Sequence, residues 1–278
     1  WGDGGIGLQI TGNVLVDRRN LEAPGNVVID GAPSNEHAVM LSRWAEACKA
    51  GGGKVVMQLS HAGRQTQKMV NPEPDAPSAI AVDRPGGQFG TPRAMTGDDI
   101  QRLIQKYAIA TKAARAAGFD GVQIHAAHGY LMSQFLSPLT NQRSDDYGGS
   151  IENRIRYPLE VFQAMREVWP SQPPMPVRVS ATDWKDGGLH PAALRPLADP
   201  LTDALRAPTH VAAAPPAPAP DPAPPGTHSH PHSHTHTHAH AHTHSRCASC
   251  GPMLRHADRK GTRLNSSHMS ESRMPSSA

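Results

Sequence analysis

Cysteine is scarce in this chain, and the shortage limits what the chain can be. The 278 residues contain 3 cysteines: Cys48 lies alone in a helical pattern, and Cys247 and Cys250 lie near the C-terminal end. A disulfide framework for a folded domain is therefore excluded. Because such cysteine usage is typical of a reducing compartment, we expect a cytoplasmic location.

Aromatic and β-branched residues are missing from the last third of the chain. All 12 Phe, Trp and Tyr lie between Trp1 and Trp184. No Ile follows Ile155, and Val211 is the only Val after Val179. Since cores are built from such side chains, the residues after Trp184 cannot build a core of their own.

The distribution of charge and the lack of long apolar runs also exclude several classes of protein. Residues 190–278 hold 8 Lys and Arg against 5 Asp and Glu, which accounts for the whole net charge of +3. The basic balance is thus a property of the tail, and we expect no nucleic-acid partner. No apolar run approaches the roughly 18 residues of a membrane span, and no signal peptide is recognisable, so we expect no membrane association. The chain begins at Trp1 instead of Met, and we interpret it as a fragment.

Strands and helices are predicted to alternate along the first 180 residues. The predicted strands, typical of buried apolar runs, are 7–10, 55–59, 121–125 and 176–180. The predicted helices are 37–50, 96–117 and 151–168, the second capped by Thr96 and Asp99. Thr11, Gly12 and Asn13 predict a loop after the first strand, and 65–97 predict one long loop rich in Pro and Gly. This order, without hairpin signals, indicates a parallel sheet covered by helices.

Three polar residues end strands of this predicted sheet. Gln58, His125 and Arg178 would collect at the carboxyl edge of the sheet, where α/β folds place their active sites. For Gln58 an ordinary loop hydrogen bond is the simpler alternative. For Arg178 the alternative is an ion pair with Asp120 or Asp183.

The segment that follows the third predicted strand carries the strongest signal. His125, His128 and Tyr130 can point into one pocket there, although an isolated HxxH pair is equally typical of a metal pair or of ordinary buried histidines. The whole block, HAAHGYLMSQFLSPLTNQRSDDYGGSIENRIRY, resembles the signature of the old yellow enzyme family of FMN-dependent NAD(P)H:flavin oxidoreductases. Further matching motifs are GIGLQITGNV, VVMQLSHAGRQ, APSAI, AAGFDGVQIHAAHGY and MPVRVSATDW, which stand in the family's order. Together they cover about residues 1–189.

The resemblance implies a fold, an activity and a set of roles. It implies a partial (β/α)8 TIM barrel that binds FMN, takes reducing equivalents from NAD(P)H and reduces an α,β-unsaturated carbonyl or similar small molecule. His125 and His128 would hydrogen-bond the acceptor's oxygen, and Tyr130 would protonate its α-carbon. Gln58 and Arg178 would contact the flavin ring. No metal site is implied, and the oligomeric state is left open.

Other residues of the signature are expected to brace the site. His61 and Arg64 are interpreted as mainly structural, with ligand contact as the minor alternative. The stretch that contains Arg143, Asp145, Tyr147 and Arg154 is interpreted as a hydrogen-bonded loop and helix start. In the family, parts beyond this match carry further flavin contacts and the phosphate site, so we expect this chain to bind FMN poorly and to be inactive.

Residues 190–278 are predicted to be a disordered, low-complexity tail. Nine prolines lie between Pro208 and Pro231, and nine histidines alternate from His228 to His244. A frame-shifted reading of GC-rich DNA and a CA repeat explains most of this, and DRKGTRLNSSH resembles translated adapter sequence. The alternative is a metal-binding protein that acts through residues 228–250, because imidazole and thiolate are good ligands for Zn²⁺. A weaker third alternative is a parallel-barrel enzyme that uses HxxH for metal-assisted hydrolysis, which needs a third ligand nearby.

Overall fold

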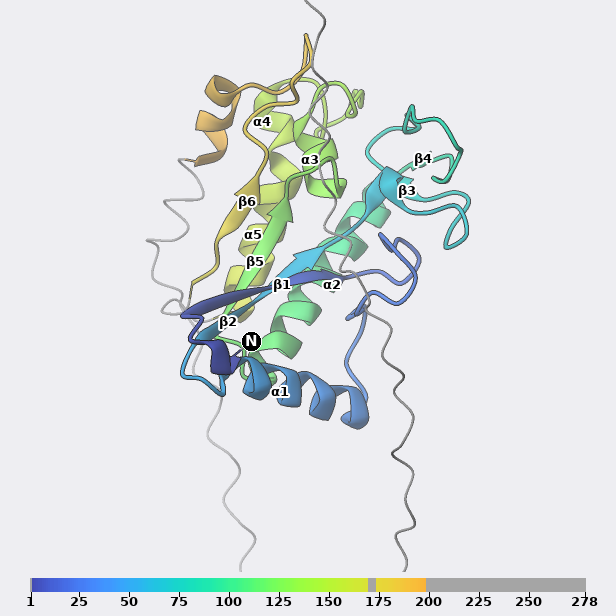
Figure 1. Ribbon diagram of the computed structural model, residues 1–278. Helices are drawn as coiled ribbons and strands as arrows, with labels where there is room; N and C mark the ends of the chain where they lie inside the picture. Colours follow the sequence, from blue (N-terminus) through green and yellow to red (C-terminus); the bar gives the residue numbers. More distant parts are fainter. Residues whose placement is uncertain (1, 170–173, 199–278) are drawn as a thin grey trace, which may run out of the picture. The chain divides into compact units, whose positions relative to one another are not determined.

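The computed structural model describes residues 2–169 and 174–198. The predicted tail, including the histidine-rich segment 228–250 with Cys247 and Cys250, lies outside these residues. The described part has a four-stranded parallel sheet in the order β1-β2-β5-β6 (Figure 1). Its strands are β1 (Leu8–Leu15), β2 (Lys54–Ser60), β5 (Gly121–Ala126) and β6 (Val177–Val179). The predicted α/β class and parallel sheet are therefore confirmed.

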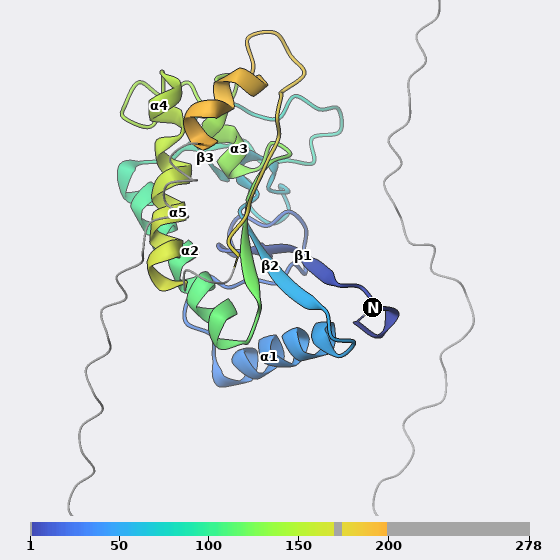
Figure 2. The ribbon, with the colours of Figure 1, turned by 90° about the vertical axis from the view of Figure 1, so that its left-hand side faces the viewer.

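Helices connect the strands, as parallel pairing requires. They are α1 (Asn35–Lys49), α2 (Gly97–Ala116), α3 (Leu131–Leu136), α4 (Ile151–Arg154) and α5 (Arg156–Val168). Helices α2 and α5 pack against each other on one side of the sheet (Figure 2). Short 3₁₀ turns lie at η1 (Gly2–Gly4), η2 (Gly63–Gln65) and η3 (Pro191–Leu194), and a second, two-residue pair joins β3 (Asp75–Ala76) to β4 (Arg93–Ala94).

The cap predicted for the longest helix is confirmed. Asp99 N–H donates to the Thr96 hydroxyl over 3.2 Å, and Thr96 N–H donates to the Asp99 carboxylate over 3.0 Å. This reciprocal capping box satisfies two backbone donors at the start of α2. Gly118, with φ +84°, follows the helix in the left-handed conformation that glycine adopts without strain.

The two faces of the sheet differ in chemistry. Alternate residues of β2 and β5 belong to the hydrophobic core: Val55, Met57, Leu59, Val122, Ile124 and Ala126. The residues between them include Gln58, Gln123 and His125. Because successive side chains of a strand point to opposite faces, these three side chains lie on the other face of the sheet. One face therefore packs in the core and the other carries polar groups.

The prediction for the first strand was wrong about where the strand ends and about how buried its first residues are. Thr11, Gly12 and Asn13 lie inside β1, which continues to Leu15 with a register irregularity between Ile10 and Asn13. The Thr11 hydroxyl accepts the Gln58 backbone N–H over 2.9 Å. A side-chain oxygen thus replaces a backbone carbonyl as the acceptor for β2 where the pairing with β1 is irregular. Leu8 and Ile10 are about half exposed, because β1 is an edge strand of the described sheet.

The helix predicted over 151–168 is divided in the structure. It is split into α4 and α5 around Ile155. Pro158 in the first turn of α5 has no N–H to donate to the preceding turn, which interrupts the hydrogen-bond ladder. Helix α3 was not predicted, because its six residues, LMSQFL, are all buried and are too few for a helical period to be recognised.

The predicted domain boundary at residue 189 stays a prediction. Leu189 and Leu197 are both buried in the core cluster of the described part. Residues just beyond 189 therefore contribute apolar packing to the same unit.

Candidate active site

The candidate site lies where β5 ends and the chain turns into α3. His128 has φ 59° and Gly129 has φ 72°, so two successive residues take the left-handed conformation. The turn brings Tyr130 directly before α3 and back over the end of the strand. The ring centroids of His125 and His128 are 5.1 Å apart, as are those of His125 and Tyr130, both edge to face. The three residues predicted to act together thus lie together.

His125 is a buried, neutral imidazole. Its side chain is buried, and its Nδ1 accepts the backbone N–H of Ala127 over 3.3 Å. Burial, with smaller effects of the neighbouring His128 and Arg178 charges, lowers the pKa of His125 to about 4. Because Nδ1 is an acceptor, the proton assigned to the neutral ring lies on Nε2, which can donate a hydrogen bond.

His128 is held by contacts from two segments, the end of β6 and the turn after β2. Its backbone N–H donates to the Ser180 hydroxyl over 2.9 Å, and its carbonyl accepts from Gln65 over 2.8 Å. Its Nε2 lies 3.2 Å from Nη2 of Arg178. Since a guanidinium only donates, Nε2 is the acceptor and the assigned proton of His128 lies on Nδ1. Partial burial and the Arg178 charge lower the pKa of His128.

Tyr130 remains a protonated phenol at neutral pH. Burial is the main cause that raises the pKa of its hydroxyl, and the Glu22 carboxylate adds to the rise. The Asn13 side chain acts on this pKa in the opposite direction. Such a phenol can serve as a general acid only toward a strongly basic atom, such as a developing carbanion.

Gln58 and Arg178 share the polar face of the sheet with His125. Gln58 pairs with Gln123, and His125 pairs with Arg178, and paired residues of adjacent strands point to the same side. The Gln58 Nε2 donates to the Gln123 Oε1 over 2.6 Å, and both side chains are buried. Arg178 is exposed on the edge strand β6. Amide and guanidinium groups therefore lie on the same face of the sheet as His125.

The alternative ion pairs for Arg178 are not formed in the described part of the chain. Asp120 is paired with Lys54 over 3.0 Å, and its other oxygen accepts the Val55 N–H over 3.0 Å. Asp183 accepts from the Ser137 hydroxyl and from the Leu189 N–H. Arg178 contacts His128 instead, which places its charge within the candidate site.

A second set of polar residues braces the turn that carries His128 and Tyr130. The buried amide of Gln134 donates to the carbonyl of Gly129 over 2.7 Å and accepts the Arg64 N–H over 3.2 Å. The carbonyl of His61 accepts the Leu131 N–H over 3.0 Å at the start of α3. The motif that ends β2 is thereby tied to the turn that ends β5, in agreement with the structural interpretation of His61 and Arg64.

The loop before α4 is also hydrogen-bonded throughout. Arg143 donates to the carbonyls of Pro77 and Met95 over 2.9 and 2.6 Å, and Arg154 donates to the carbonyl of Leu136 over 2.8 Å. Arg143 therefore joins the long loop to the site segment. The predicted bracing role of this stretch agrees with these contacts.

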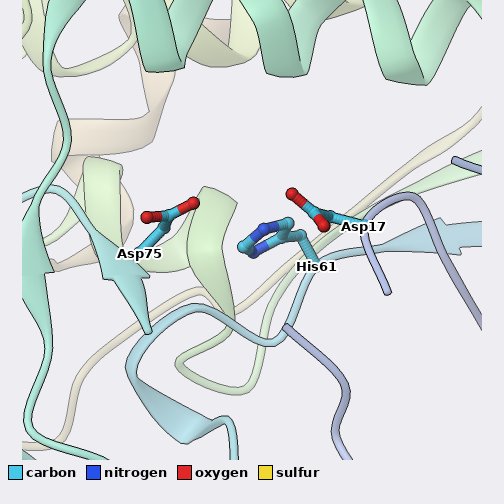
Figure 3. A group of neighbouring side chains, drawn as sticks. All are labelled: Asp17, His61 and Asp75. Atoms are coloured by element: carbon cyan, nitrogen blue, oxygen red, sulfur yellow. The ribbon is translucent and has the colours of Figure 1, made fainter. Parts of the chain in front are cut away.

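One group of buried residues has the composition of a metal site. Ligand atoms of Asp17, His61 and Asp75 lie within 4.8 Å of one another, and the imidazole lies between the two carboxylates (Figure 3). His61 Nδ1 accepts the Gly63 N–H over 3.1 Å, so the neutral ring carries its proton on Nε2, the atom that a metal would need. The tautomer therefore opposes metal binding at this group.

The charges around this group oppose a metal as well. Asp17 is paired with Arg19 over 2.9 Å and with Lys106 over 3.2 Å. Asp75 is paired with Arg93 over 2.5 Å and with Arg19 over 3.3 Å. Burial alone would raise the pKa of Asp17, but the hydrogen bonds with Arg19 and the neighbouring positive charges hold it well below its usual range. The two carboxylates are thus already neutralised by protein cations.

Sequence reasoning missed three residues of the site region. Gln123 lies two residues before His125 on the same strand, so period-2 alternation predicts that it shares the polar face. Asn13 was assigned to a loop and lies in β1, paired with Gln58. Nothing in the local sequence singles out Glu22, which lies in the loop after β1 and whose carboxylate helps to raise the pKa of Tyr130.

The described fold and site define a class of protein. A parallel α/β sheet carries clustered polar residues at the carboxyl edge of its central strands, as catalytic α/β domains do. Within that class, residues 3–198 match the NADH:flavin oxidoreductase / NADH oxidase family, which has the old yellow enzymes among its members. The chain belongs to this family, and its described part is a portion of a (β/α)8 barrel.

Similar proteins agree with this assignment. The chain is 42% identical over 186 residues to an NADPH dehydrogenase of Clostridium acetobutylicum, covering 66% of this chain and 52% of that protein. It is 38% identical over 195 residues to an NADH-dependent flavin oxidoreductase of Aspergillus parasiticus, covering 69% and 44%. The structure of morphinone reductase superposes with a TM-score of 0.64 at 32% identity, covering 73% of this chain and 58% of that one. The chain spans about half the length of the curated relatives it matches.

Proposed function

We propose that the protein to which this chain belongs is an FMN-dependent NAD(P)H oxidoreductase that reduces a small, electron-poor acceptor such as an α,β-unsaturated carbonyl. The observation that carries the proposal is the cluster of His125, His128 and Tyr130 beside Gln58 and Arg178 on one face of the sheet. Family membership and the names of the relatives support it.

The residues present fit one edge of a flavin ring. The ring of FMN has amide-like donors and acceptors on its pyrimidine edge, which the Gln58 amide can complement, and a cation such as Arg178 favours the reduced, anionic ring. Gln58 already donates to Gln123, so its carbonyl oxygen is left as the acceptor for a ring N–H. When bound, FMN would supply the two-electron chemistry that no side chain of this site provides.

The histidines would bind and polarise the acceptor molecule. Both are neutral at pH 7, and the proton assignments leave Nε2–H of His125 and Nδ1–H of His128 as donors. Two such donors on one carbonyl or nitro oxygen withdraw electrons from the conjugated system and stabilise the negative charge that develops there. Arg178 holds the ring of His128 in the orientation that this requires.

Tyr130 would supply the proton that completes the reduction. Its phenol is protonated at pH 7, and its ring lies edge to face with that of His125. Proton transfer from the phenol to the α-carbon then neutralises the enolate. The phenolate that remains is reprotonated from water.

The experiment that tests the function is purification of the protein from the complete gene, followed by its absorbance spectrum and FMN release. A yellow protein with about one FMN per chain whose flavin is reduced by NADH or NADPH is expected. A correctly folded protein that neither carries nor binds FMN would contradict the proposal. Tyr130→Phe should retain the flavin and lose most of the alkene reduction, on the order of 100-fold or more.

The 278-residue chain itself is proposed to bind FMN weakly and to be inactive. Titration of the chain with FMN, followed by quenching of flavin fluorescence, tests this. Arg178→Ala should weaken any binding further, whereas Arg115→Ala, a change on the exposed surface of α2, should not. Tight, stoichiometric binding would overturn the expectation for the chain and would leave the family function supported.

The remaining sequence-based expectations stay predictions. In the described part of the chain, no helix is long and apolar enough to cross a membrane. A cytoplasmic location and the absence of nucleic-acid partners are proposed on the composition alone. The metal-binding alternative depends on residues 228–250, beyond the family match that ends at 198, and is not favoured. The hydrolytic alternative has no support, because His125 and His128 belong to no group of three potential ligands among the described residues.

A further inference from the structure

The side chains of Gln58 and Gln123 form a buried amide pair on the polar face of the sheet. The two residues are register partners in the parallel pairing of β2 with β5, so their side chains lie next to each other. The Gln58 Nε2 donates to the Gln123 Oε1 over 2.6 Å, and the two residues are only 4% and 8% exposed. At such burial, solvent cannot readily replace a lost partner.

The backbone of Gln58 is fixed as well. Its N–H donates to the Thr11 hydroxyl over 2.9 Å, in the part of β1 where the pairing with β2 is irregular. A half-turn of the Gln58 amide, which exchanges its nitrogen and its oxygen, changes the shape of the side chain very little. Hydrogen bonds therefore decide which of the two amide orientations is present.

The bond to Gln123 determines which atom of Gln58 is left for a ligand. The Gln123 oxygen can only accept, so Gln58 must present an N–H to it. The Gln58 oxygen accepts no hydrogen bond from the described residues, and it is not among their fully buried polar atoms without a partner. It is therefore accessible from the polar face. In the reversed orientation this oxygen would be bonded to Gln123, and only N–H groups would face a ligand.

We propose that Gln123 is a positioning residue for Gln58: by accepting an N–H of Gln58, it leaves the Gln58 oxygen available to accept the ring N–H on the pyrimidine edge of FMN. The inference rests on the proposed function, in which Gln58 contacts the flavin ring. That edge presents one N–H between two carbonyl oxygens, so an amide that offered only donors would leave this N–H without a partner. Gln123 itself needs no contact with the flavin.

The orientation of Gln58 is tested without flavin, by NMR of the full chain. With glutamine labelled by ¹⁵N at the side-chain amide, the two protons of each amide give separate signals, and Gln58→Met assigns those of Gln58 by their loss. Gln123→Glu places a carboxylate, which only accepts, at the same position. Gln123→Met removes the acceptor at similar size, and Gln105→Met, on the exposed side of α2, is the matched control. Circular dichroism checks that each variant folds.

The proton that Gln58 donates should respond to both changes at Gln123. It should move downfield in Gln123→Glu, because a charge-assisted hydrogen bond is stronger. It should move upfield in Gln123→Met, toward the position of an amide without a protein partner, and stay unchanged in Gln105→Met. An unchanged signal in Gln123→Met overturns the inference. If that variant does not fold, Gln123→Glu decides alone, and an upfield move there overturns the inference.

The consequence for flavin recognition is measured with FMN and with N3-methyl-FMN, in which a methyl group replaces the hydrogen of the ring N–H. The protein from the complete gene is stripped of its flavin, and quenching of flavin fluorescence gives the dissociation constant of each compound. The ratio of the two constants reports the hydrogen bond to the ring N–H, whereas a general loosening of the fold weakens both compounds alike. Gln58→Met gives the ratio that the bulk of the methyl group causes by itself.

The preference for FMN should depend on the acceptor at position 123. The ratio should be kept in Gln123→Glu, although the added charge can weaken both affinities, and it should be kept in Gln105→Met. Gln123→Met should lower the ratio about fivefold or more, toward the Gln58→Met value, as expected when a buried donor loses its partner. Equal ratios in the wild type and Gln123→Met overturn the inference, even if both affinities fall.

The two measurements separate the inference from the function on which it rests. A complete, folded protein that binds neither compound contradicts the proposed function and with it the flavin role of Gln123, while the amide signals still decide the orientation of Gln58. If FMN binds and neither the amide signal nor the ratio changes in Gln123→Met, the function stands and the role of Gln123 is rejected.

Discussion

The inner strands and the edge strands of the described sheet differ in how deeply their residues are buried. Every residue of β5 and all but the first of β2 are buried, whereas β1 alternates between exposed and half-buried until its last two residues, and β6 is largely exposed. The inner pair supplies packing and holds His125. The edge pair brings Asn13 and Arg178 to the same face. The difference indicates that the inner strands stabilise the fold, and that the edges contribute polar contacts to the site at low cost in core packing.

The largest expected difference comes from the same substitution on an inner and an edge strand. Ile124→Ala in β5 removes a fully buried side chain from the core, and we expect it to lower the free energy of unfolding by about 2–5 kcal/mol. Ile10→Ala in β1, where the side chain is 48% exposed, should cost less than about 1 kcal/mol. Urea unfolding followed by circular dichroism measures both. Equal losses would show that β1 and β5 contribute alike.

The second prediction concerns pH and the end of the inner strand β2. Burial lowers the pKa of His61 to about 4, below the value of about 6.5 in an unfolded chain. The unfolded chain therefore binds more protons between these values, so the stability that His61 contributes is complete above pH about 6.5 and is lost as the pH falls toward 4. The loss is about 3 kcal/mol from the size of the shift.

The variant that tests this is His61→Gln, compared with His190→Gln at an exposed position. Unfolding by urea at a series of pH values should show a shallower loss between pH 6.5 and about 4 in His61→Gln than in the wild type. His190→Gln should follow the wild type. The same slope in all three proteins would exclude His61 as the source.

The smallest expected effects separate a buried from an exposed ion pair. Lys106→Met leaves the buried carboxylate of Asp17 with one cation fewer, and we expect a loss of about 1–3 kcal/mol. Arg18→Met breaks the pair with Asp30 on the loop after the edge strand β1, where the arginine side chain is 74% exposed, and should cost clearly less than Lys106→Met because water screens an exposed pair. Thermal unfolding at low and high salt measures the two. Salt should weaken the exposed pair more, and the reverse order would contradict the comparison.

Local patterns predicted the inner part of the fold well. The apolar runs at 55–59 and 121–125 correspond to β2 and β5, and the pair Thr96 and Asp99 correctly marked the start of α2. These features depend on neighbours within a few residues, so a single stretch of sequence contains them. The motif around His125, His128 and Tyr130 is equally compact, which is why three candidate site residues could be named together.

Predictions were poorer wherever distant segments decide the outcome. The strand β1 continues through Thr11, Gly12 and Asn13 because β2 supplies the pairing partners, although glycine and asparagine locally favour a turn. The helix α3 forms from six buried residues, a segment too short for its pattern to distinguish a helix from a strand. The partner of Arg178 proved to be His128 instead of an aspartate, since the pairing of β6 with β5 sets which side chains meet.

The sequence by itself determined the alternating α/β order, the core face of the inner strands and the family to which the chain belongs. Only the tertiary structure decided that Asn13 lies in β1 on the polar face, that Arg178 contacts His128, and that protein cations neutralise Asp17 and Asp75. The physical reason is that propensity, capping and strand periodicity act between near neighbours. The electrostatics of a site depend on parallel pairing, which brings residues far apart in the chain to one edge of a sheet.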